Sequence, residues 1–173
     1  ITFPKELFDL YNLSKSIASS IYSCSCVPIQ YGLNHFLQNP VSLKNYLKCI
    51  NDIYLIISNI AIKHLKNTKL LYLKPNSSWY IFLDFRNYSE KLKKYHNIDN
   101  SIDLVNMLTN KIGFVGVAGK YFGHNGLCMR ISLIDIDISR LNFLSNKESD
   151  IELSCHRIIG GLEKLTNFLN TIK

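Results

Sequence analysis

The chain has 173 residues, 47% hydrophobic and 12% aromatic, a composition that supports one packed domain with or without an appendage and excludes a disordered protein. Its net charge of +7 comes from 20 basic and 13 acidic residues spread along the sequence, so no nucleic-acid partner is indicated. No apolar run is long enough to span a membrane, and no signal peptide is visible. Five cysteines without metal-type spacing favour reduced thiols in a cytoplasmic protein over a disulfide framework or a zinc site.

The first third of the sequence predicts helices after a short strand-like start. One helical pattern follows Pro4, and a second runs from residue 29 to about 37, where Asn39-Pro40 ends it. The longest pattern runs from 42 to 66, with Ser42 as its expected cap and apolar residues at three- and four-residue steps. A helix of about 25 residues would be about 40 Å long, which suggests an element that bridges two bodies.

The remaining sequence predicts strands interleaved with helices. Strands are expected at 70–73, at 79–85 and around Arg130, and helices at 101–112, 137–144 and 150–169, with a polar stretch at 86–100. Trp79 and Tyr80 are expected in the core rather than in a stacking platform. This order of elements predicts an α/β (α+β) fold in which a small sheet packs against helices.

Residues 113–133 carry the most informative pattern in the chain. They contain an apolar run, a turn with three glycines, and a strand with one positive charge, Arg130. Because an unpaired buried charge is costly, an arginine in an apolar strand needs an anionic partner. A guanidinium binds a carboxylate through two parallel hydrogen bonds, so a substrate carboxylate is a candidate. The alternatives are a solvated side chain or an ion pair with Asp135 or Asp137.

The glycines of this turn could also be interpreted as a phosphate cradle. The spacing of Gly119, Gly123 and Gly126 fits neither a P-loop nor a dinucleotide fingerprint, so we interpret them as turn residues. Between them lies His124, for which no acid–base partner can be predicted. We therefore expect His124 to be an exposed loop residue.

The order of these motifs resembles the C-terminal part of class I/II aminotransferases, the fold-type I enzymes that use pyridoxal 5'-phosphate. The resemblance is carried by the hairpin that begins at Lys74-Pro75, by the turn at 118–123, where Ala118 replaces the usual proline, and by Arg130-Ile131-Ser132. It implies that Arg130 binds the α-carboxylate of an amino-acid or 2-oxo-acid substrate. It also implies three parts: residues 1–40 as the tail of the large cofactor domain, 41–67 as a long interdomain helix, and 68–173 as the small C-terminal domain.

Two further segments resemble cofactor-binding motifs of that family. Lys15 lies in a sequence similar to the Schiff-base lysine motif, but the glycine- and arginine-bearing strand that should follow is missing. We therefore expect Lys15 on a helix surface and the family's lysine upstream of this chain. Ser25 resembles a serine that can approach the cofactor phosphate; the alternative is a serine-rich loop before a helix that starts at Pro28.

The resemblance thus implies a fragment of a pyridoxal-phosphate-dependent aminotransferase that is a homodimer when intact. The start at Ile1 fits such a fragment, and the fragment alone is expected to lack pyridoxal chemistry. A first alternative is a non-catalytic binding or dimerisation module on the same domain. A second is a basic nucleic-acid-binding domain, which predicts steep salt dependence but has no clustered basic and aromatic face. The amino donor and acceptor cannot be read from the sequence.

Overall fold

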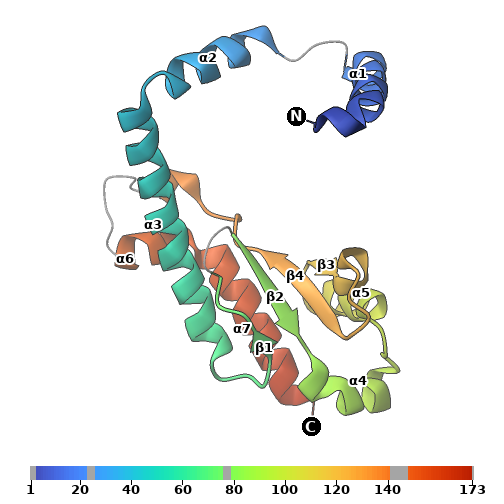
Figure 1. Cartoon of the computed structure of the whole chain (residues 1–173). Coiled ribbons are helices and arrows are strands. Elements are labelled where there is room, and N and C mark those ends of the chain that lie inside the picture. Colours follow the sequence, from blue (N-terminus) through green and yellow to red (C-terminus); the bar gives the residue numbers. More distant parts are fainter. Residues whose placement is uncertain (1–2, 23–25, 76–78, 141–147, 173) are drawn as a thin grey trace. The chain divides into compact units, whose positions relative to one another are not determined.

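The computed structural model describes residues 3–22, 26–75, 79–140 and 148–172 (Figure 1). The chain divides into two compact units, residues 1–47 and 48–173. The first unit is helical, with η1 (Lys5–Leu7), α1 (Phe8–Tyr22), α2 (Val27–Leu37) and the first turns of α3 (Pro40–Leu65). The predicted helices of this region are confirmed. α3 begins two residues before the expected Ser42 cap, because the fixed φ of Pro40 suits the first turn of a helix.

The second unit is a small α+β domain, as the sequence predicts. Its four strands form one antiparallel sheet in the order β1-β2-β4-β3. After the end of α3 the elements are β1 (Leu71–Tyr72), β2 (Tyr80–Asp84), η2 (Arg86–Tyr88), α4 (Ser89–His96), α5 (Ser101–Ile112), β3 (Val117–Ala118), η3 (Gly119–Phe122), β4 (Cys128–Ser132), η4 (Ile138–Arg140), α6 (Glu148–Ser154) and α7 (His156–Thr171).

Two predicted helices differ from the observed ones. The expected helix at 137–144 is only the single turn η4 where it is described, since residues 141–147 lie outside the described part. The expected helix at 150–169 is two helices, α6 and α7, separated at Cys155. There the backbone N–H of Asp137 donates a hydrogen bond to the carbonyl of Ser154 (2.9 Å), the last residue of α6. A segment distant in sequence therefore supplies a donor for a carbonyl at the C-terminal end of this helix. This long-range bond has no signal in the local sequence.

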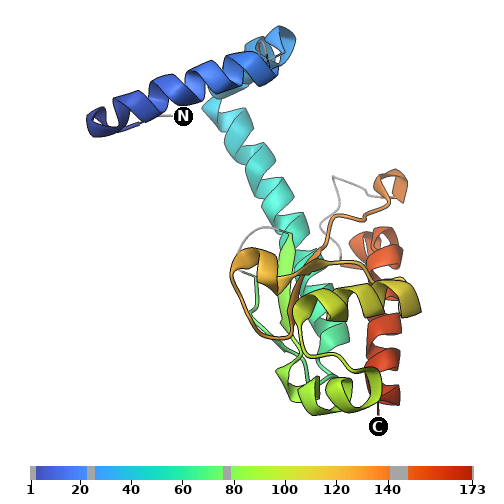
Figure 2. The ribbon, with the colours of Figure 1, turned by 90° about the vertical axis from the view of Figure 1, so that its right-hand side faces the viewer.

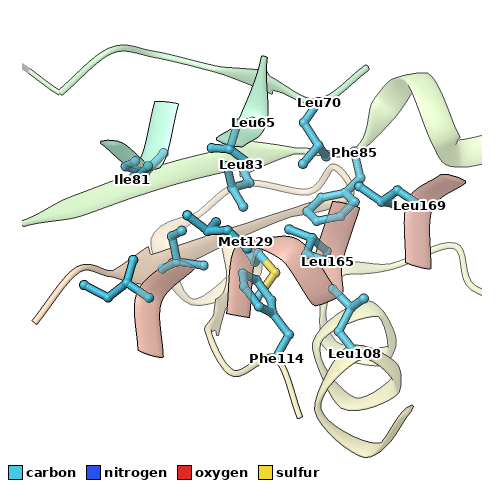
Figure 3. Close-up of a cluster of buried hydrophobic side chains, with 14 of the residues drawn as sticks. Leu65, Leu70, Ile81, Leu83, Phe85, Leu108, Phe114, Met129, Leu165 and Leu169 are labelled. Carbon is cyan, nitrogen blue, oxygen red and sulfur yellow. The ribbon is translucent and has the colours of Figure 1, made fainter. Parts of the chain in front are cut away.

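One face of the sheet packs against helices and forms the core. The C-terminal part of α3 lies on this face together with α5 and α7 (Figures 1 and 2). Figure 3 shows Leu83 of β2, Met129 of β4 and Leu165 of α7 gathered in one cluster, and all three side chains are completely buried. Burial of this apolar surface is the main stabilising contribution to the unit. The opposite face of β2 and β4 is free of this core.

No helix in the described ranges combines the length and the apolar character needed to cross a bilayer. Likewise, no disulfide joins the cysteines of those ranges, and none of their His, Cys, Asp and Glu residues form a group of three that could hold a metal ion.

Candidate carboxylate-binding site

Strand alternation builds a second, partly polar face on the sheet, opposite the core. Tyr80, Phe82 and Asp84 occupy every second position of β2 and are half-buried, whereas the residues between them are buried in the core. Arg130 lies in the middle of β4, also half-buried, and pairs in register with Phe82 on one side and with Val117 of β3 on the other. The predicted strand position of Arg130 is therefore correct, and its side chain belongs to this outer face.

Two aromatic rings contact the guanidinium of Arg130. Its central carbon, Cζ, lies 4.0 Å from the ring centroid of Tyr80 and 4.5 Å from that of Phe122. One ring comes from β2 and the other from the turn η3. A cation over an aromatic ring is attracted by the negative face of the π-system, and a stacked guanidinium keeps its N–H groups available at its edge. The two rings thus support the charge, and no described side chain accepts a hydrogen bond from its N–H groups.

Arg130 has no carboxylate partner among the described residues. The two acids that the sequence offered as alternative partners are engaged elsewhere: Asp135 pairs with Arg157 (3.0 Å), and Asp137 pairs with Arg140 (3.1 Å). In the described part of the chain Arg130 is neither in an ion pair nor hydrogen-bonded to a side chain. Neither Asp135 nor Asp137 is therefore the anionic partner of Arg130.

The acid on the outer face, Asp84, forms an ion pair with the neighbouring Arg86. Its Oδ2 accepts a hydrogen bond from Nε of Arg86 (2.8 Å), and its Oδ1 accepts one from the backbone N–H of the same residue (2.9 Å). Burial raises the pKa of the Asp84 carboxyl, but the hydrogen bonds and the charge of Arg86 outweigh it, and the pKa lies below its ordinary value. Asp84 is therefore ionised and paired at neutral pH.

His124 and Cys128 form a pair beside this acid. Cys128 faces Asp84 across the β2–β4 ladder, and its Sγ lies 3.0 Å from Nδ1 of His124, which also accepts a hydrogen bond from the N–H of Gly126 (3.0 Å). Burial and the charge of Asp84 raise the pKa of the Cys128 thiol, although Arg86 partly opposes them. A thiol that keeps its proton is a poor nucleophile, so the pair holds the turn rather than offering a reactive sulfur. His124 is exposed as expected, and Cys128 is the partner that the sequence did not reveal.

The glycines of this turn have structural roles, as predicted. Gly123 ends η3 with a φ of +77°, a conformation that glycine adopts without strain. A Cβ at Gly119 would lie 2.2 Å from Sγ of Cys128, so only glycine allows the turn to approach the sheet this closely.

Gly119→Ala is expected to destabilise the domain by about 1–3 kcal/mol, because the added methyl group must push the turn away from Cys128. Denaturant unfolding measures the effect. The control is Gly160→Ala in α7, where a Cβ would have no neighbour within 4 Å and where alanine favours the helix. Equal stability of the two variants would contradict the close approach.

Other sequence predictions for site residues have mixed outcomes. Trp79 and Tyr80 are not core residues: Trp79 is 37% exposed and contacts the rings of Tyr54 and Tyr80 at centroid distances of 5.4 and 5.7 Å, so that expectation is wrong. Lys15 is exposed on α1, as predicted. Ser25 lies outside the described residues. The sequence analysis also missed Phe122, which lies in an irregular turn whose contacts no periodic pattern predicts.

Comparisons with known proteins support the fold. No protein-family model matches the chain, and no curated protein matches it in sequence. Among solved structures, the chain is similar to one described as Thermus thermophilus aspartate aminotransferase tetra mutant 1, with a TM-score of 0.54 and 14% sequence identity. The likeness covers 83% of this chain and 34% of that chain, so the chain spans about a third of the length of that enzyme. At this identity the likeness shows a shared fold.

Proposed function

We propose that this chain supplies the substrate-carboxylate site of a pyridoxal-phosphate-dependent enzyme of the aminotransferase type. In this proposal Arg130 binds the α-carboxylate of an amino acid or a 2-oxo acid through the N–H groups at the edge of its guanidinium. Residues 1–40 then form the tail of a larger cofactor domain, residues 41–67 the interdomain helix and residues 68–173 the small domain. The fold shared with part of an aspartate aminotransferase supports the enzyme class.

The observation that carries the proposal is the state of Arg130. It is half-buried in a central strand, it rests on two aromatic rings, and no carboxylate in the described residues is paired with it. A guanidinium held in this way is poised for an external anion with two parallel acceptors, and a carboxylate has that geometry.

The described residues do not fit an anchor for pyridoxal phosphate. A lysine that forms a Schiff base needs a desolvated amine with a lowered pKa. Every lysine within the described ranges, Lys15 included, is exposed to solvent. We therefore assign to these residues only the binding and orientation of the substrate carboxylate. The cofactor supplies the electron sink for the reaction when it is bound in the intact protein.

The proposal is tested by titrating the chain with pyruvate, the simplest 2-oxo acid, and following the Nε–Hε signal of Arg130 by NMR. A saturable shift of this signal, with smaller shifts for the guanidinium groups of Arg86 and Arg157, is the expected result. These two arginines are the controls, because each already has a carboxylate partner. The absence of any saturable change at Arg130 would overturn the proposed function.

The enzyme class needs a separate test on the intact protein. Addition of pyridoxal phosphate is expected to give an absorption band near the visible that an amino acid removes. The same mixture with this chain alone is expected to give no such band, and a band that disappears in Lys15→Ala would show that Lys15 is the anchor after all.

Exposed apolar residues in the first unit support a second candidate function, dimerisation. None of its described side chains is buried, although α1 carries a stripe of large apolar residues at three- and four-residue steps. The stripe consists of Leu10, Leu13, Ile17 and Ile21, which are 47–67% exposed. An apolar stripe of this kind suits the same stripe of a second copy across a twofold axis, which is the commonest symmetry of protein oligomers.

Ile17→Asp is expected to shift a dimer of this chain towards monomer, because it places a charge in the middle of the stripe. Sedimentation velocity over a range of protein concentrations measures the shift. Ser19→Asp is the matched control, since Ser19 is exposed on the opposite side of the same helix. A wild-type chain that is monomeric at high concentration, or a dimer that Ile17→Asp leaves intact, would refute the dimerisation candidate.

A further inference from the structure

We propose that Tyr80 and Phe122 are positioning residues that fix the guanidinium of Arg130 for its ligand, an inference that rests on the proposed function. Neither residue needs to contact the carboxylate. Their rings lie 4.0 and 4.5 Å from Cζ of Arg130 and come from two separate elements, so a rotation of the guanidinium away from one position loses contact with both.

This support matters because arginine is a long and flexible side chain. An unsupported arginine on a sheet surface loses rotamer freedom when it binds a ligand, and that loss weakens the affinity. The rings of Tyr80 and Phe122 restrict Arg130 before any ligand arrives, while the N–H donors at its edge stay available. Pre-organisation of this kind raises affinity without an additional contact to the ligand.

Phe122 is itself held in place by the sheet. Its ring meets that of Phe82 edge-to-face at a centroid distance of 5.9 Å, and Phe82 is the strand neighbour of Arg130. The ring of Phe82 also lies 6.3 Å from that of His124, two residues beyond Phe122 in the same turn. The N–H of Gly126 donates a hydrogen bond to Nδ1 of His124, so the turn that follows Phe122 has a second contact of its own.

Tyr80 lies at the start of β2, the strand that also contains Phe82. It is the first residue of β2 and faces Ser132 across the ladder to β4, and its ring packs beside Trp79. Trp79 in turn contacts Tyr54 of α3. The two rings on Arg130 therefore pack against different side chains, Phe122 against Phe82 and Tyr80 against Trp79.

Phe122→Leu is expected to weaken pyruvate binding about fivefold, the effect of losing one cation–π contact of ordinary strength. In the ligand-free protein, the Hε signal of Arg130 is expected to move downfield, because the shielding from one ring is lost. Tyr80→Leu is the second variant and is expected to act in the same direction. Phe122→Trp keeps an aromatic face and is expected to restore both the affinity and the upfield signal.

The matched control is Tyr121→Leu; Tyr121 is the neighbouring residue in η3, is 71% exposed, and is not one of the two residues whose rings lie over the Arg130 guanidinium. Wild-type affinity and an unmoved Hε signal are expected for this variant. If wild-type protein binds pyruvate and Phe122→Leu binds it equally well, the positioning role is wrong while the proposed function stands. If wild-type protein does not bind pyruvate, the proposed function is wrong. The Hε signal then still tests the ring contacts: an Hε chemical shift of Arg130 that is the same in wild type, Phe122→Leu and Tyr80→Leu would refute the positioning role of the two rings.

Discussion

Arg130→Ala is expected to weaken pyruvate binding at least a hundredfold. Hydrogen bonds between charged groups contribute about 1.5–3 kcal/mol each to binding or stability, and the variant removes both bonds of a bidentate pair. Isothermal titration calorimetry with wild-type and variant chains at low ionic strength gives the two dissociation constants. The fold of the variant is expected to stay intact, because Arg130 has no ion pair in the described residues and is half-buried on the outer face.

Arg130→Lys separates charge from geometry. A lysine keeps the positive charge, but it cannot offer two parallel N–H donors or a planar face to the two rings. We therefore expect an affinity between those of the wild-type and alanine proteins. The matched control is Arg157→Ala, which removes an exposed arginine that is already paired with Asp135. A loss of binding in Arg157→Ala as large as in Arg130→Ala would mean that net charge, rather than the site, attracts the ligand.

Leu83→Ala is expected to destabilise the second unit by about 2–5 kcal/mol. Leu83 is completely buried between the sheet and the helices, so the substitution loses apolar contacts and leaves a cavity (Figure 3). The only tryptophan in the sequence, Trp79, lies in this unit, and its fluorescence during urea unfolding measures the stability of this unit.

Leu71→Ala is the matched control for this substitution. Leu71 is the same residue type in the neighbouring strand β1, but it is 43% exposed. Leu71→Ala is expected to lower the free energy of unfolding by about 1 kcal/mol or less, in the range of surface substitutions. Similar losses in both variants would mean that the inner face of the sheet is not the core.

Much of the fold could be predicted because it depends on local patterns. The long helix α3 follows from apolar residues at three- and four-residue steps, and the strand β2 follows from a run of aromatic and apolar residues. Arg130 was identifiable because a single charge in an apolar strand is unusual. The interruption at Cys155 was not predictable, since the contact found there is a hydrogen bond to Ser154 from Asp137, 17 residues earlier.

The environment of Arg130 could be predicted only in part. The sequence pointed to Asp135 and Asp137 as nearby acids, but strand register and the turn after β4 bring them to Arg157 and Arg140 instead. The role of Tyr80 was missed because an aromatic residue in a strand is usually part of the core, and only the register with β4 reveals that it faces outward. Phe122 could not be assigned because the path of a glycine-rich turn over a sheet is a long-range property.

The dimensions of the sheet have a consequence for the behaviour of the protein at high concentration. Its two central strands, β2 and β4, have five residues each, whereas the edge strands β1 and β3 have two residues each and pair with only two positions of β2 and of β4. A long, flat edge with free backbone groups templates the addition of a foreign strand, which is how many proteins begin to form fibrils. Edges this short offer an incoming strand too few hydrogen bonds to hold it. The edge strands β1 and β3 are therefore poor templates for fibril growth.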